Sequence, residues 1–199
     1  TGLYNRRFLT QQVDRDLAIS VRQYEQAGAE GAQAAADADV VFFMIDIDYF
    51  KRINDEHGHA AGDSVLTDCC ARLKATFRDS DYLVRWGGEE FLAVVRNSQR
   101  EHASELAERI RRTIFDKPFV MQDGQSWPVS VSIGVASFPV LRDQPRRFSW
   151  LEVVGICDSA LYAAKAAGRN GWVNIGLGDQ KPNVLPLPSE EKEKNLRHI

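Results

Sequence analysis

The sequence predicts an α/β domain in which helices flank a central antiparallel sheet. The run "VVFFMIDI", residues 40–47, is apolar without alternation, which is typical of a strand covered on both faces. Apolar residues recur at helical spacing in residues 61–77, 103–114 and 153–164. Because strand patterns alternate with these helical patterns along the chain, we expect layers of helix packed on a sheet.

The first segments fix the start of the domain. Residues 1 to about 20 form the first predicted helix, with apolar side chains near 3.6-residue spacing. The stretch "EQAGAEGAQAAADAD", residues 25–39, lacks large apolar side chains, so we expect a helix extension followed by a mobile surface loop. The central strand at 40–47 and a helix from Ala61 to Phe77 come next.

The second half completes the sheet. Two short strands at 82–86 and 91–95 flank a double glycine, and a helix marked by Ala103 to Ile114 follows. The remaining predicted elements are a hairpin at Asp123-Gly124, a strand at 129–135 with one face on helices, a helix ending near Gly168, and a strand at 172–175. From the central strand onward the order is β-α-α-β-β-α-β-α-β, typical of a ferredoxin-like core with additions.

Length and composition predict one domain, residues 1–176, and a disordered tail, residues 177–199. The tail has three prolines and a charge run without an apolar period. With 199 residues, 44% of them hydrophobic and 27% charged, the chain matches soluble globular proteins. The net charge of −3 gives no global field that attracts nucleic acid, so an anionic ligand needs local charge or metal.

The three cysteines, Cys69, Cys70 and Cys157, show neither disulfide nor zinc spacing. We expect core thiols in a reduced, cytoplasmic protein. No apolar run approaches the roughly 18 residues of a membrane span, and no signal peptide opens the chain, so this fragment is expected to make no membrane contact.

Carboxylates follow two predicted strands at the point where they would meet. Asp46 and Asp48 end the central strand, where burial without a partner is costly, so they must face solvent or a cation. In "RWGGEEF", Glu89 follows the double glycine; if the strands pair, Asp46 and Glu89 converge. Two such carboxylates repel unless a metal lies between them, and hard oxygen ligands suit Mg²⁺ or Mn²⁺. Taken singly, each motif fits exposed strand-end acids and an ordinary hairpin equally well.

Together, the motifs are more specific. The segments "DIDYFKRINDEHGHAAGD", "RWGGEEF" and "DSALYAAKAAGRNG", with the opening "TGLYNRRFL" and the strand "VSVSIGVASF", resemble the GGDEF family, the diguanylate cyclase domains of bacterial signalling. The resemblance covers Thr1 to about Ile175. It implies a nucleotidyl-cyclase-like fold and the condensation of two GTP molecules to cyclic di-GMP with loss of two pyrophosphates.

The resemblance also implies roles for individual residues. Asp46 and Glu89 match the catalytic metal carboxylates, with the Ile47 carbonyl as a further ligand; Glu89 stands where the family name has Asp, a common active variant. Glu89 is also a candidate to assist proton removal. The substrate-binding positions implied by the family are Phe50, Lys51, Asn54, His59, Asp63, Gly87, Gly88, Lys165 and Arg169.

Physical reasons support several of these assignments. Asn54 and Asp63 match the guanine-binding residues, and an Asp that accepts from guanine N1 and its amine disfavours adenine. The phosphate contacts of the family are matched by Lys51, Lys165 and Arg169. Lys165 and Arg169 are four residues apart and are expected to share a helix face. The two glycines let backbone approach phosphate.

Structural alternatives exist for several positions. Lys165 and Arg169 also fit a solvated helix end near the macrodipole. His59 also fits a surface histidine, and Asn54-Asp55 a helix-terminating turn.

A second site is implied upstream of the glycines. Arg78 and Asp81 resemble the Arg-x-x-Asp motif of product inhibition, and Arg109 matches the arginine that completes it. The strand at 82–86 spans roughly 17 Å, so this site and the glycine turn should lie at its opposite ends. A surface salt bridge is the alternative interpretation of the tetrapeptide.

Partners follow from the product. One domain offers one GTP site and cyclic di-GMP is two-fold symmetric, so catalysis is expected to need a second copy of the domain. The family motif that opens the domain carries an aspartate before Thr1. A sensory or dimerising module normally precedes that motif in the family. Attachment of a longer parent protein to a membrane is therefore left open. Two rival functions are a catalytically silent domain that binds GTP or cyclic di-GMP, and a metal-dependent phosphohydrolase.

Overall fold

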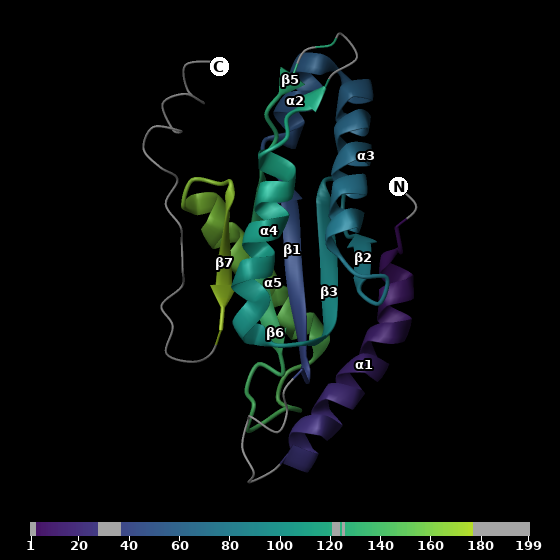
Figure 1. Cartoon of the computed structure of the whole chain (residues 1–199), viewed down its shortest axis with the longest axis vertical. Helices are drawn as coiled ribbons and strands as arrows, with labels where there is room; N and C mark the ends of the chain where they lie inside the picture. Colours follow the sequence, from purple (N-terminus) through teal and green to yellow (C-terminus); the bar gives the residue numbers. More distant parts are fainter. Residues whose placement is uncertain (1–2, 28–36, 121–123, 125, 177–199) are drawn as a thin grey trace.

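A computed structural model describes residues 3–27, 37–120, 124 and 126–176 as helices on both faces of a five-stranded, mainly antiparallel sheet (Figure 1). The α/β fold class expected from the sequence is confirmed. The elements are α1 (Arg6–Ala27), β1 (Asp39–Ile47), α2 (Phe50–His57), α3 (His59–Thr76), β2 (Tyr82–Arg85), β3 (Glu90–Ser98), the 3₁₀ helix η2 (Arg100–His102), α4 (Ala103–Phe115), β4 (Phe119–Val120), β5 (Ser126–Trp127), β6 (Val131–Phe138), α5 (Trp150–Ala166) and β7 (Gly171–Ile175).

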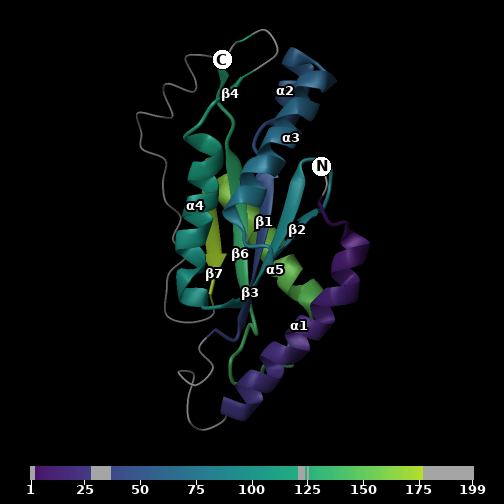
Figure 2. The same ribbon diagram turned by 45° about the vertical axis from the view of Figure 1, so that its right-hand side comes forward.

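Strand β1 lies at the centre of the sheet, whose order is β2-β3-β1-β6-β7. It pairs antiparallel with β3 and with β6, and β6 pairs parallel with β7. All nine residues of β1 are buried because α3 and α4 cover one face of the sheet and α1 and α5 cover the other (Figures 1 and 2). The expectation of a central strand covered on both faces is confirmed.

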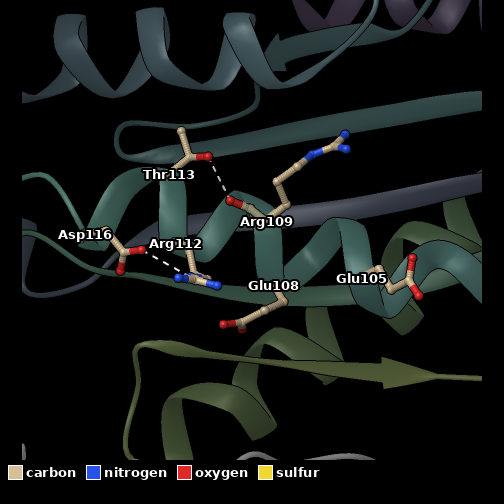
Figure 3. Close-up of a pocket in the computed structure, with 6 residues that line it drawn as sticks. All are labelled: Glu105, Glu108, Arg109, Arg112, Thr113 and Asp116. Atoms are coloured by element: carbon tan, nitrogen blue, oxygen red, sulfur yellow. Dashed lines mark hydrogen bonds and ion pairs between the residues drawn. The ribbon is translucent and has the colours of Figure 1, made fainter.

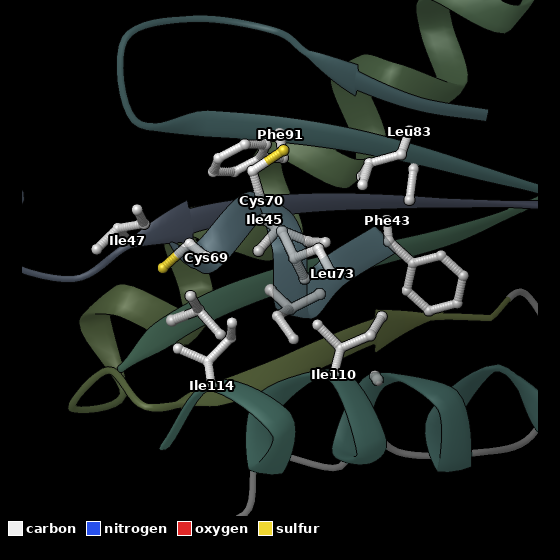
Figure 4. Close-up of a cluster of buried hydrophobic side chains, with 14 of the residues drawn as sticks. Phe43, Ile45, Ile47, Cys69, Cys70, Leu73, Leu83, Phe91, Ile110 and Ile114 are labelled. Atoms are coloured by element: carbon white, nitrogen blue, oxygen red, sulfur yellow. The ribbon is translucent and has the colours of Figure 1, made fainter. Parts of the chain in front are cut away.

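Two hydrophobic cores result from the alternation of side chains along β1. Phe43 and Ile45 pack with Leu73 of α3 and Ile110 of α4 (Figure 4), whereas Phe42 packs with the helices of the other face. All three cysteines are buried, as expected of core thiols. Burial raises the pKa of each thiol and keeps it protonated.

The first helix begins at Arg6, later than predicted, and continues past Ser20 to Ala27. Val21 and Tyr24 extend its buried stripe, and its last residues lie where a helix extension was expected. The expected loop falls on residues 28–36, and the expected tail on 177–199; both lie outside the described residues. Within the described ranges, no helix combines the length and apolar character needed to cross a bilayer.

Strand β6 is covered on both faces, so the expectation that one face packs on helices understated its burial. Small side chains on its second face allow α5 to approach closely. A Cβ at Gly134 would lie 1.9 Å from the Cys157 carbonyl oxygen and 2.4 Å from the Leu161 nitrogen. Glycine at 134 is therefore required by the distance between β6 and α5.

The hairpin expected at Asp123-Gly124 is supported by its flanking strands. Strands β4 and β5 pair antiparallel, Phe119 opposite Trp127, and Gly124 has a φ of 82°. Asp123 lies outside the described residues.

Gly134→Ala should destabilise the domain by about 3 kcal/mol, because the methyl group meets backbone atoms that cannot rotate away. Gly155→Ala on α5 is the matched control: its Cβ meets no heavy atom within 4 Å, and replacing a helical glycine should stabilise by about 0.5–1 kcal/mol. Urea unfolding measures both. A Gly134→Ala stability close to wild type would contradict the packing argument.

Candidate active site

The carboxylates predicted to converge come together at one end of the sheet. Asp46 lies opposite Glu90 in the β1–β3 pairing, and the Ile47 N–H donates to the Glu89 carbonyl at 3.3 Å. The glycine turn is closed by the Trp86 N–H, which donates to the Glu90 carbonyl at 2.8 Å. The β1–β3 pairing therefore places Asp46 beside Glu89, as the sequence predicted.

Asp46 faces a cation. It is only 6% exposed, and Lys165 Nζ lies 2.9 Å from its Oδ2. Burial raises the pKa of Asp46, and the neighbouring charges of Glu89 and Asp48 raise it further, whereas the Lys165 ammonium opposes them. Burial, which disfavours the charged form, is the largest cause of the raised pKa.

Asp48 faces neither solvent nor a cation among the described residues, so the sequence prediction was wrong for this acid. It is 4% exposed and accepts hydrogen bonds from the hydroxyls of Ser130 and Ser132, both at 2.6 Å, and from the Asn170 N–H at 3.0 Å. Neutral donors replace the water that the carboxylate loses. Asp48 thereby ties the end of β1 to β6 and to the turn before β7.

The donors at the end of β1 fit a hard divalent cation. Asp46 and Glu89 offer carboxylate oxygens and Ile47 a backbone carbonyl oxygen, which are the kinds of ligand that hard divalent cations prefer. In the described part of the chain, no three His, Cys, Asp or Glu side chains cluster as metal ligands. Such an ion would need further oxygens from a phosphate ligand or water, as Mg²⁺ commonly does.

Helices α2 and α3 bring the predicted base-binding residues near each other. Asn54 lies inside α2, not in a terminating turn, and a Cβ at Gly62 would lie 2.0 Å from Asn54 Oδ1 and 3.1 Å from Phe50. The Asn54 side chain therefore lies against the residue that precedes Asp63. Asp63 itself is exposed on α3; Lys51 and His59 are exposed as well.

The glycine turn is open to a ligand. Gly88 is exposed, and a Cβ there would meet no heavy atom within 4 Å; at Gly87 a Cβ would meet the Glu90 carboxylate at 2.5 Å. Arg85, which sequence reasoning missed, donates to the Gly88 carbonyl from Nη2 at 2.7 Å and to the Gly87 carbonyl from Nε at 3.3 Å. Its position directly before the turn was the only signal in the sequence.

Lys165 and Arg169 do not share a helix face. Helix α5 ends at Ala166, and Gly168 and Arg169 have φ of 122° and 64°, so Arg169 lies in the turn that leads to β7. Its guanidinium lies over the Tyr49 ring, 4.5 Å from the centroid, whereas Lys165 contacts Asp46. The expectation of a shared face failed because the helix, predicted to end near Gly168, ends at Ala166 and leaves Arg169 in the following turn.

The second predicted site lies at the other end of β2. The Arg78 N–H donates to Asp81 Oδ2 at 3.0 Å, and Asp81 Oδ1 is buried without a hydrogen-bond partner among the described residues. Arg109 donates to the Thr76 carbonyl at 3.3 Å, which places it near the start of this segment.

Arg109 also lines a surface pocket of about 420 Å³ on α4 (Figure 3). Arg109 and Thr113 project from one side of the helix, and Glu108, Arg112 and Asp116 from the other. Arg78, Asp81 and Arg109 are thus grouped away from the glycine turn.

The chain is similar to known proteins of one family. Residues 1–171 match the family described as diguanylate cyclase, GGDEF domain. Diguanylate cyclase A of Treponema denticola is 42% identical over 127 residues, which cover 64% of this chain and 33% of that protein.

Two solved structures are similar in fold as well as sequence. The active GGEEF domain of a diguanylate cyclase from Vibrio cholerae is 30% identical, with a TM-score of 0.66 over 90% of this chain and 99% of that one. The GGDEF domain of DgcB from Caulobacter crescentus, in complex with c-di-GMP, is 26% identical, with a TM-score of 0.69 over 85% and 90%. The chain spans less than half the length of the first curated relatives it matches. With its glycine turn, paired carboxylates and sheet order, it belongs to the GGDEF family of diguanylate cyclase domains.

Proposed function

We propose that this domain condenses two GTP molecules into cyclic di-GMP with release of two pyrophosphates. The observation that carries the proposal is the buried Asp46 beside Glu89 at the open glycine turn, with Lys165 at 2.9 Å. A catalytically silent binding domain would usually lack a metal carboxylate or a turn glycine, and this chain keeps both. The family relationship favours cyclase chemistry over a phosphohydrolase.

In this mechanism the 3′-hydroxyl of one GTP attacks the α-phosphorus of the other in line, and pyrophosphate leaves. Asp46, Glu89 and the Ile47 carbonyl would hold Mg²⁺ or Mn²⁺. When bound, such an ion neutralises triphosphate charge and lowers the pKa of the attacking hydroxyl. Glu89 lies at the rim of the turn, where it can also accept the hydroxyl proton.

The remaining residues bind and orient the nucleotide. Asn54 and Asp63 hydrogen-bond guanine from α2 and α3, with Phe50 and His59 beside them. Lys51, Lys165 and Arg169 contact the phosphates, and Gly87 and Gly88 leave room for the triphosphate against the backbone.

Assembly completes the reaction. Each domain supplies one GTP site, so two copies must face each other for both bonds of the cyclic product to form. Because two copies must meet, the activity of this chain should rise more than linearly with its concentration.

Product inhibition is the second part of the proposal. Cyclic di-GMP binds at Arg78, Asp81 and Arg109, where the arginines take guanine edges or phosphate and Asp81 holds the Arg78 backbone through its N–H. The bound product holds two copies of the domain in a geometry that keeps their GTP sites apart. Because β2 separates the product site from the glycine turn, this inhibition does not distort the turn.

Incubation with GTP and Mg²⁺, followed by mass analysis of the products, tests the function directly. Cyclic di-GMP with pyrophosphate supports cyclase activity. GDP or GMP with phosphate indicates a hydrolase, and unchanged GTP a silent binding domain.

Asp46→Asn and Glu89→Gln should each lower the rate of cyclic di-GMP formation more than tenfold, because each removes a metal-binding charge. Asp158→Asn, an exposed acid on α5, is the control and should retain the parental rate. Circular dichroism verifies that the variants fold. A rate above a tenth of wild type in either carboxylate variant would contradict the metal assignment.

ATP should be a poorer substrate than GTP by a factor of ~10² in kcat/KM, because adenine leaves the Asp63 carboxylate without its donors. Steady-state rates with both nucleotides measure the ratio. Comparable turnover of ATP would mean that Asn54 and Asp63 do not read the base.

Arg78→Ala should weaken cyclic di-GMP binding at least tenfold and relieve inhibition, with the initial velocity nearly unchanged. Arg22→Ala on α1 is the matched surface control. Calorimetry and initial rates with added product measure both effects. If Arg78→Ala binds the product as tightly as wild type, the product site lies elsewhere.

A further inference from the structure

The side chain of Tyr49 does not contribute to the helix that follows it or to the core. It precedes α2 with a φ of 54°, a left-handed conformation that glycine and asparagine adopt more easily than an aromatic residue. Its side chain makes no capping hydrogen bond to α2 and is 60% exposed. Neither helix capping nor core packing therefore accounts for a tyrosine here.

Among the described residues, the ring and the hydroxyl of Tyr49 both interact with Arg169. The Arg169 guanidinium lies 4.5 Å from the centre of the Tyr49 ring, and Nη1 donates to the Tyr49 hydroxyl at 3.3 Å. A guanidinium lying over an aromatic ring loses part of its rotational freedom but keeps the other N–H groups for an anion.

The backbone of Arg169 is fixed from the opposite side. Arg169 and Asn170 both have positive φ, and the Asn170 N–H donates to the buried Asp48 carboxylate at 3.0 Å. Arg111 of α4 donates to Asn170 Oδ1 at 3.0 Å. The turn is thus anchored in the core, and only the long Arg169 side chain remains to be oriented.

We infer that Tyr49 is a positioning residue, which holds the Arg169 guanidinium in place for the nucleotide triphosphate. The inference rests on the proposed function, in which Arg169 contacts phosphate. An arginine oriented before binding loses less conformational freedom when the phosphate arrives, so the gain is in affinity for the nucleotide. The chemical step depends on the carboxylates and should change little.

The experiment measures the affinity of a GTP analogue that cannot react at the α-phosphorus, together with KM and kcat for GTP. Tyr49→Asn, which suits the left-handed backbone, should weaken analogue binding and raise KM about three- to tenfold, with kcat within twofold. Tyr49→Phe keeps the ring and should recover most of the affinity. Tyr162→Ala, an exposed tyrosine on α5, is the control.

A double-mutant cycle with Arg169→Ala separates positioning from a general structural effect. If Tyr49 acts through Arg169, Tyr49→Asn changes affinity less than twofold once Arg169 is alanine. The same loss in both backgrounds, or wild-type affinity in Tyr49→Asn alone, overturns the inference. Analogue binding needs no turnover, so a failure of cyclase activity in the wild type refutes the proposed function without deciding the role of Tyr49.

Discussion

A carboxylate buried at the end of the central strand is the constraint on which the site depends. Asp46 is carried into the interior by a strand whose other residues are buried on both faces, so the acid cannot move to water without disrupting the sheet. Burial and the nearby acids disfavour its charged form, and Lys165 offsets this only in part. The fold thus holds Asp46, with its charged form only partly stabilised, at the rim where the glycine turn opens.

The two acids that end β1 show how equal burial leads to different roles. Asp48 has three neutral donors from β6 and from the turn before β7, so its hydrogen-bonding capacity is used within the fold. Asp46 has one lysine, whose flexible side chain can exchange one anion for another. Asp48 therefore links β1 to β6 and to the turn before β7, whereas the Asp46 carboxylate remains available to a ligand.

The sequence predicted the features that depend on local pattern. The uninterrupted apolar run at 40–47 identified the central strand, and the glycine turn placed Glu89 beside Asp46. It did not predict the donors of Asp48, because Ser130 and Asn170 are more than 80 residues away along the chain.

The end of α5 was predicted near Gly168, and the helix ends two residues earlier at Ala166, before Gly168 takes a positive φ. The position of Arg169 relative to Lys165 was not predicted. Arg169 is placed by that turn, and its contact with Tyr49 depends on two left-handed residues far apart in the chain. Helical spacing alone carries no information about such a contact.

The opposite end of β1 provides an internal comparison. Asp39 is as deeply buried as Asp46, and burial alone would raise its pKa, but hydrogen bonds from Arg100 and Tyr24 lower the pKa below its ordinary value. Burial and the hydrogen bond to Asp39 also raise the pKa of Tyr24 to about 12, so the phenol stays protonated as the donor. Asp39 is thus fully paired within the protein.

The pKa of Asp46 is shifted in the other direction on the same strand. Burial raises the pKa at both ends, and the partners differ: Arg100 and Tyr24 outweigh burial at Asp39, whereas Lys165 offsets burial only in part at Asp46. A divalent cation bound beside Asp46 would supply the stabilisation that Asp39 receives from Arg100 and Tyr24.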